Sequence, residues 1–286
     1  MMSTMKFILP LIALSFLISV ESCDIIDEPF KGPPSPTDTT NLADVDDISQ
    51  TQTTVFVEDF TGHRCKNCPK AGKVMKELDS LYGDQFVGLA IHAGPESFTG
   101  VTAEYPTDFT TEAGDDILQF FNIFALPLGM VQRMDFPNSQ KTYTAWISLS
   151  ANELASSPKI LLDLDSDYDP VSGAAVLRYR VRPQVSINHG LKVAVFIKES
   201  HIIAPQLMPD NTRNENYVHN NVFRAAPLGS FGQDLTTDPS GPGDLFNDII
   251  LTGTSDGWDP SECEWVVVVY NPADYRIIQS GEIDLS

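Results

Sequence analysis

Two of the four cysteines in this chain stand at a spacing that suits redox chemistry. Cys65 and Cys68 are separated by two residues and lie between a β-rich run at 54–60 and an amphipathic pattern at 69–82. A C-x-x-C pair at a strand-to-helix junction is typical of dithiols that exchange with disulfides. We expect Cys65 to be the first residue of the helix. A helix N-terminus favours thiolate over thiol, so Cys65 would attack a substrate disulfide. Cys68 would then resolve the mixed disulfide.

Two other interpretations of this pair stay open. A structural disulfide needs only the same two cysteines at the same spacing. A zinc site needs four ligands, and the sequence has neither a second C-x-x-C nor paired histidines. His63 is near enough in sequence to join the cysteines, but we expect a solvated loop residue there. We therefore predict no metal and no cofactor, with redox exchange and a structural disulfide as the alternatives.

The first 22 residues predict export. Lys6 precedes an apolar run at 7–20, which is too short to span a bilayer and has the length of a signal-peptide core. The run ends at Ser22-Cys23, which resembles the lipobox of bacterial lipoproteins. That resemblance implies cleavage before Cys23 and acylation of its sulfur, so that Cys23 anchors the chain to a membrane. The alternative is an ordinary secretory signal with an incidental cysteine.

Charge and composition exclude one class of partner and describe the segment after the anchor. The chain has 39 acidic and 18 basic residues, a net charge of −21, and 42% apolar residues. So acidic a protein repels nucleic acid, while the apolar fraction predicts a folded core. Residues 23–52 are rich in proline, threonine and acids, and we expect an extended tether there.

The next hundred residues alternate between strand and helix patterns. Residues 53–157 therefore predict an α/β domain built from βαβ units. We expect strands at 54–60, 86–92 and 129–134, and helices at 69–82, 116–124 and 143–155.

Beyond Pro158 the helical periods disappear. Residues 158–286 predict an all-β domain, an antiparallel sandwich, with long loops at 205–217 and 229–260. The alternating acids from Asp163 to Asp169 are expected on a solvated strand face, because they fail the EF-hand calcium pattern. Cys263 is expected to be a buried free thiol. The expected strands are 159–165, 174–182, 191–199, 218–225, 265–271 and 276–283.

The segment 57–69 resembles the active-site segment of thioredoxin-like proteins. In that family a buried aspartate lies six residues before the first cysteine, and Asp59 matches it. The resemblance implies that Asp59 accepts the proton of the buried second thiol; a strand-end charge is the alternative. It also implies a cis-proline opposite the C-x-x-C, and Pro127 is the match. Two positions depart from the family: Arg64 replaces tryptophan, and Leu128 replaces threonine.

The whole chain is similar to Bacteroidetes outer-membrane lipoproteins of the twenty-eight-kilodalton Omp family. The features shared are the lipobox, the acidic tether, the C-x-x-C-P motif and a later β-domain containing the segment 217–224. The resemblance implies a lipid-anchored location at the outer membrane, on either face. It leaves two functions open. One is thiol–disulfide exchange with a protein thiol or disulfide substrate. The other is a non-enzymatic envelope or surface protein that binds a protein or glycan, with the C-x-x-C as a structural disulfide.

Overall fold

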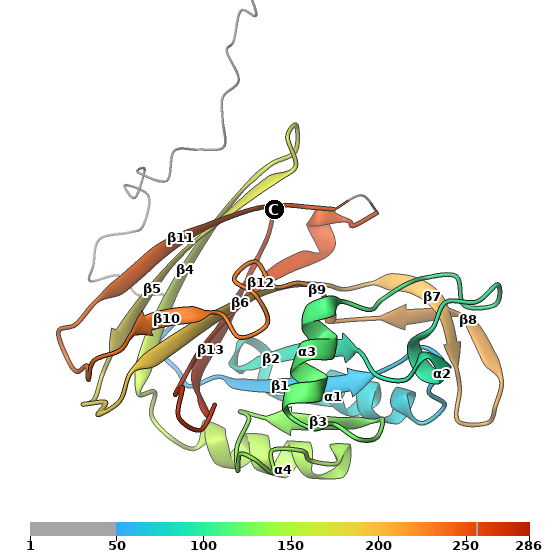
Figure 1. Ribbon diagram of the computed structural model, residues 1–286, viewed down its shortest axis with the longest axis horizontal. Helices are drawn as coiled ribbons and strands as arrows, with labels where there is room; N and C mark the ends of the chain where they lie inside the picture. The colour runs from blue at the N-terminus through green and yellow to red at the C-terminus, as the bar shows by residue number, and fades with distance from the viewer. Residues whose placement is uncertain (1–49, 256) are drawn as a thin grey trace, which may run out of the picture. The chain divides into compact units, whose positions relative to one another are not determined.

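The computed structural model describes residues 50–286 apart from residue 256, and Figure 1 shows the arrangement of their elements. The predicted signal peptide, Cys23 and most of the predicted tether lie outside these residues. Within the described part, no helix is both long and apolar enough to cross a membrane.

The first half of the described chain forms the predicted α/β arrangement. The strands are β1 (Val55–Thr61), β2 (Phe86–His92) and β3 (Leu128–Val131). β1 pairs in parallel with β2 and antiparallel with β3. Parallel neighbours need a crossover connection, and α1 (Cys68–Tyr82) provides it.

Helices cover both faces of these strands. On one face, Met75 and Leu78 of α1 pack with Trp146 of α4 (Tyr143–Leu154) against β1. The opposite face carries α3 (Glu112–Phe120), which begins four residues before the predicted start because Thr111 accepts a hydrogen bond from the Gly114 N–H. The short elements are η1 (Gly83–Gln85), α2 (Glu96–Thr99) and η2 (Pro260–Glu262).

Strands of the second half continue the same sheet. Its order is β13–β12–β6–β9–β2–β1–β3, with β10 paired to β6. β9 joins the halves, because Val222 lies opposite both Ala90 of β2 and Glu199 of β6. The added strands are β6 (Leu191–Glu199), β9 (Val222–Ala225), β10 (Gln233–Thr236), β12 (Cys263–Tyr270) and β13 (Ile277–Asp284).

This continuity differs from the predicted division into separate domains near residue 157. The described residues belong to one compact unit. The change of pattern at Pro158 marks the end of the helices, not the end of the sheet. An unpaired edge of β2 would expose backbone donors and acceptors, and strands from the second half cover it.

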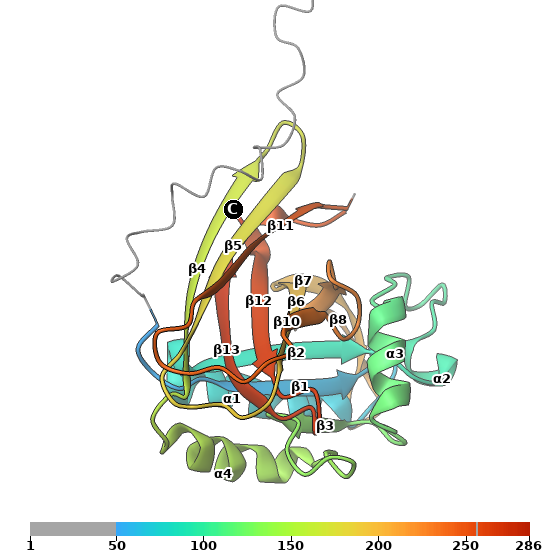
Figure 2. The same ribbon diagram turned by 60° about the vertical axis from the view of Figure 1, so that its left-hand side comes forward.

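A second, antiparallel sheet packs on the large one (Figure 2). It has the order β11–β5–β4 and consists of β4 (Ile160–Asp169), β5 (Ala174–Pro183) and β11 (Phe246–Gly253). Leu177 and Tyr179 of β5 share a buried apolar cluster with Val195 of β6 and Trp265 of β12. The fold class is thus a mixed α/β part followed by a β-rich part.

The alternating acids on β4 pair with arginines of β5. Arg178 is 3% exposed and lies 2.9 Å from Asp165 and 2.6 Å from Asp167. Asp163 is buried and pairs with Arg180. The predicted solvated face is therefore wrong for Asp163 and holds only for the outer acids.

Two predicted loops contain strands. β7 (Ile202–Leu207) and β8 (Arg213–His219) form a hairpin, a two-stranded sheet of its own, where a loop over 205–217 was expected. The predicted strand at 218–225 is interrupted because Asn221 adopts a left-handed conformation with φ of 56°. β10 and β11 lie within the loop expected at 229–260. The prolines and polar residues in these segments are not typical of strands, so the sequence did not predict these strands. Their pairing depends on partners that are distant in the sequence.

Candidate functional site

The two cysteines of the C-x-x-C motif form a disulfide just beyond the end of β1. Their Cα atoms are 5.4 Å apart, and Cys68 is the first residue of α1, followed by Pro69. The prediction that Cys65 opens the helix is therefore wrong. Cys68 is at the first position of the helix, and both sulfurs, which are bonded to each other, lie beside its N-terminus.

Both cysteines are buried, which differs from the expected accessible Cys65. Each is 2% exposed. The β7–β8 hairpin lies against the motif: Leu207 donates its backbone N–H to the His63 carbonyl oxygen over 2.8 Å. The Gln206 side-chain amide lies 3.3 Å from the Cys65 carbonyl oxygen and donates to it. The second half of the chain thus covers the C-x-x-C disulfide.

Asp59 is buried on β1 and forms no ion pair with any residue that the structure describes. It is 2% exposed, and its Oδ1 atom has no hydrogen-bond partner among the described residues. Burial raises the pKa of this carboxyl to about 8, so it carries its proton at neutral pH. A buried, unpaired carboxyl costs stability, and such groups are typical of sites where protons move.

Pro127 directly precedes β3. The Leu126–Pro127 peptide bond is cis. β3 begins at the next residue, Leu128, which lies opposite Phe60 of β1. The register therefore brings Pro127 to the end of β1 that leads into the C-x-x-C motif.

A cavity of about 800 Å³ lies behind the disulfide, and we call it the inner cavity. Asp59 and Cys68 line it from the first half of the chain, and Lys198, Tyr217 and Glu282 line it from the second half. Burial and the charge of Asp59 together raise the pKa of Tyr217, which indicates that the two side chains are neighbours. The cavity therefore brings Cys68 and Asp59 together with residues that the sequence alone did not connect with them.

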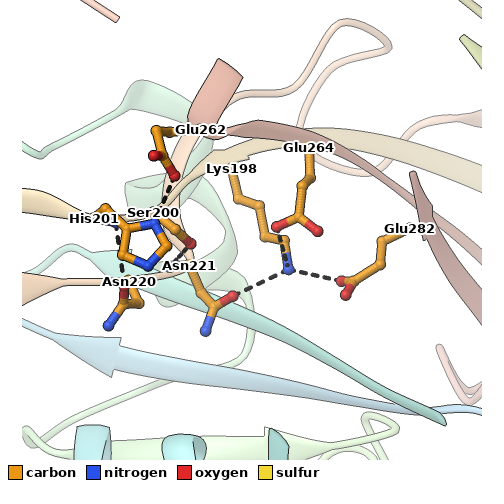
Figure 3. Close-up of polar contacts among 8 residues, drawn as sticks. All are labelled: Lys198, Ser200, His201, Asn220, Asn221, Glu262, Glu264 and Glu282. Carbon is orange, nitrogen blue, oxygen red and sulfur yellow. Dashed lines mark hydrogen bonds and ion pairs between the residues drawn. The ribbon is translucent and has the colours of Figure 1, made fainter. Parts of the chain in front are cut away.

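Residues of a buried lysine network, drawn in Figure 3, line the inner cavity. Lys198 Nζ lies 2.7 Å from Glu282, 3.1 Å from Glu264 and 3.0 Å from the Asn221 side-chain oxygen. Burial alone would lower the pKa of Lys198, but the two carboxylates outweigh it and the pKa is raised. Burial raises the pKa of Glu282 to about 7. The network thus holds a charged lysine beside a carboxyl that titrates near neutral pH.

Three of the five histidines gather beside the motif. His92 and His219 lie 4.7 and 4.8 Å from the Phe109 ring, and His63 lies 5.4 Å from the Tyr105 ring. Burial lowers the pKa of all three, so they are neutral at pH 7. His63 is 1% exposed, and the prediction of a solvated loop residue is wrong. Across residues 50–286 without 256, no three His, Cys, Asp or Glu side chains are arranged to hold a metal.

Sequence reasoning missed Lys198, Glu264 and Glu282. The available signal was a lysine inside the otherwise apolar strand 191–199, where a charge needs buried partners. His219 lies in the aromatic cluster beside Phe109. Cys263 is free and buried, as predicted, and burial raises its pKa to about 12.

Two solved structures share this fold at low sequence identity, and a third aligns over part of the chain. HBP35 of Porphyromonas gingivalis aligns with a TM-score of 0.64 and 16% identity, covering 82% of this chain and 76% of that one. Protein AGR_C_4864 from Agrobacterium tumefaciens aligns with a TM-score of 0.51 and 10% identity, covering 83% of this chain and 97% of that one. A domain of the outer membrane lipoprotein Omp28 from Porphyromonas gingivalis aligns over 45% of this chain and 89% of that one, with 13% identity and a TM-score of 0.27.

Among curated protein sequences, none matches this chain. The family model described as "Outer membrane protein Omp28" does match, over residues 115–282, which is more than half of the chain. The matched residues include most of the β-rich part and the lysine network. The chain therefore belongs to the outer membrane protein Omp28 family.

Proposed function

We propose that this protein is an outer-membrane lipoprotein that exchanges thiols and disulfides at Cys65 and Cys68. The description of the family supports a location at the outer membrane. The Ser22-Cys23 sequence supports an acyl anchor at Cys23. Residues 53–157 would act as a thioredoxin-like unit and residues 158–286 as a β-sandwich unit on the shared sheet. The strand–C-x-x-C–helix order and the proline at 127 support the first assignment.

The main support for the redox proposal is the position of the Asp59 carboxyl. This buried carboxyl lines the same cavity as Cys68 and lacks a salt-bridge partner among the described residues. Breaking or forming the disulfide requires a proton to reach or leave the buried sulfur. A carboxyl whose pKa is about 8 can give and take that proton near neutral pH.

The exchange rate of an Asp59→Asn variant tests this proposal. We expect disulfide reduction by a model dithiol to slow by roughly a hundredfold or more, which is the usual contribution of a positioned acid–base group. The wild-type rate should change with pH around the Asp59 pKa of about 8, and this inflection should be missing in the variant. Equal rates and equal pH profiles would exclude Asp59 as the proton-transfer group.

A second function is favoured by one observation, the burial of both cysteines under the hairpin. A disulfide that is 2% exposed at each residue can serve as a structural clasp. The protein would then be a non-enzymatic envelope protein that binds a protein or glycan through its β-rich part. Wild-type protein that exchanges with no dithiol in its folded state would favour this alternative.

A further inference from the structure

We infer that the exchange partner is a small disulfide, uncharged or cationic, that enters the inner cavity and forms its mixed disulfide with Cys68, not with Cys65. This inference rests on the proposed thiol–disulfide exchange and adds a substrate class and a point of attack.

Access is the first argument. Cys68 lines the inner cavity, and Cys65 does not. On the Cys65 side, the hairpin is held by the Leu207 N–H to His63 and by the Gln206 amide to Cys65. Which sulfur of a buried pair reacts depends on which one a partner can reach. The cavity therefore directs exchange to Cys68.

The nature of the thiol is the second argument. In the reduced protein, Cys68 stands at the first position of α1, where the helix favours its thiolate. Asp59, whose Oδ1 is buried without a hydrogen-bond partner in the described part, lines the same cavity. Nucleophile and proton carrier thus line the same cavity.

The size and charge of the cavity define the substrate class. About 800 Å³ lies within the usual range for small-molecule sites and is too small for a folded protein partner. Apart from Asp59, five acidic side chains line the cavity against three lysines. His92 and His219 add uncharged imidazoles, each with one buried ring nitrogen that has no hydrogen-bond partner within residues 50–286 without 256. The lining therefore disfavours anions and accepts uncharged or cationic molecules.

The proposed reaction is balanced without another reagent. The Cys68 thiolate attacks a disulfide RSSR, so that the Cys68–SR bond forms, the S–S bond of RSSR breaks and RS⁻ leaves. Asp59 gives its proton to RS⁻ and then takes the proton of the Cys65 thiol. The Cys65 thiolate attacks Cys68 and releases the second RS⁻. The substrate is reduced to RSH and RS⁻, and the protein is oxidised to its Cys65–Cys68 disulfide.

Three small disulfides of similar size and different charge provide the test. Cystamine is cationic, hydroxyethyl disulfide is neutral and dithiodiglycolate is anionic. Each is mixed with the reduced full chain in its Cys65→Ser and Cys68→Ser forms, and mass spectrometry follows the mixed disulfides. Each rate of mixed-disulfide formation is divided by the rate at which a free model thiol reacts with the same disulfide. Tryptic cleavage after Lys66 separates the two motif positions, and buried Cys263 serves as an internal unreactive thiol.

We expect the Cys65→Ser form, which keeps Cys68, to react at least roughly tenfold faster than the Cys68→Ser form. At low salt, cystamine and hydroxyethyl disulfide should exceed dithiodiglycolate by a similar factor. A Gly72→Leu substitution narrows the cavity, because a Cβ at position 72 already lies 3.2 Å from the Tyr217 hydroxyl. It should slow the Cys68 reaction, provided that circular dichroism shows an intact fold. The milder Gly72→Ala substitution is its matched control.

A faster reaction at Cys65 than at Cys68 would overturn this inference. Rates that depend neither on the charge of the disulfide nor on the substitution at Gly72 would also overturn it. Both results would leave the proposed function standing. Failure of the reduced wild-type protein to react with these disulfides and with a dithiol-derived cyclic disulfide would instead overturn the proposed function itself.

Discussion

The backbone N–H of Leu207 donates to the carbonyl oxygen of His63 over 2.8 Å and thereby joins the β7–β8 hairpin to the turn that carries Cys65. The hairpin is a two-stranded sheet of its own, and the Gln206 side-chain amide adds a second bond to this turn. The same chain therefore supplies both the C-x-x-C disulfide and its cover.

Loosening this cover should expose Cys65. A Gln206→Ala substitution removes the side-chain amide that donates to the carbonyl oxygens of Gly62 and Cys65. We expect faster alkylation of Cys65 in the reduced variant than in the reduced wild type, measured by maleimide labelling and peptide mapping. An Asn214→Ala substitution on the same hairpin is the control. Unchanged labelling of Cys65 would show that these bonds do not hold the cover.

Asp59 should make the folded protein less stable as pH rises. Its folded pKa is raised from 3.8 to about 8, so the unfolded chain loses this proton at lower pH than the folded protein does. Stability is greatest below the unfolded pKa and falls until the pH passes about 8. In the oxidised form, Asp59→Asn should unfold at higher urea concentration than wild type at pH 9. This gap should shrink toward pH 4. A constant gap would contradict the assignment.

His219 should have the opposite dependence. Burial lowers its pKa from 6.5 to about 4, so the unfolded chain takes up this proton first as pH falls. Stability is fully present above pH 6.5 and is lost as pH falls toward 4, by about 1.4 kcal/mol per pH unit for one histidine. His219→Phe should reduce this loss in urea titrations. His92, whose pKa is also lowered by burial, should keep part of it.

The ion pair between Arg133 and Glu58 should be far more important than an exposed pair. Both side chains are 0% exposed, and Arg133 contacts both carboxylate oxygens, at 2.9 and 2.6 Å. Glu58→Gln leaves a buried guanidinium unpaired, and we expect a loss of about 3–5 kcal/mol in urea unfolding. Asp135→Asn, which breaks the exposed pair with Lys141, should cost about 1 kcal/mol or less. Similar losses would contradict this ranking.

The anchor can be tested without structural information, because Cys23 lies outside the described residues. Cys23→Ser should yield protein without acyl chains that partitions into the aqueous phase of a detergent separation. Wild-type protein should enter the detergent phase and carry the added acyl mass in mass spectrometry. A wild-type chain with no acyl mass would remove the lipoprotein assignment.

Local patterns predicted the first half of the fold well. The strand at 86–92, the helix at 143–154 and the crossover between β1 and β2 follow from periodicity alone. Asp59 and Pro127 were chosen by the resemblance to thioredoxin-like proteins, Asp59 because it lies six residues before Cys65 and Pro127 because it precedes an expected strand. The hairpin could not be predicted in this way, since its position depends on contacts with His63 and Cys65, more than a hundred residues earlier.

The lysine network shows the same limit at the site. Lys198 contacts Glu264 and Glu282, which come from two other strands. Such a group can be predicted only when the order of the strands in the sheet is known. The sequence predicted two separate domains and not one shared sheet. The three clustered histidines are likewise distributed between β2, β8 and the turn before the motif. A single sequence contains no periodicity that brings them together.

The link between the first and last strands has a consequence for biogenesis. Thr54, near the start of β1, donates its side-chain hydroxyl to the carbonyl oxygen of Ser280 on β13, 226 residues later. Gln279 accepts from the Thr54 backbone N–H at 3.1 Å. Contacts of such long sequence separation form late and slow folding. A chain that emerges from a translocation channel N-terminus first must therefore wait for its final strand before this closure can form, and until then its early strands need protection from aggregation.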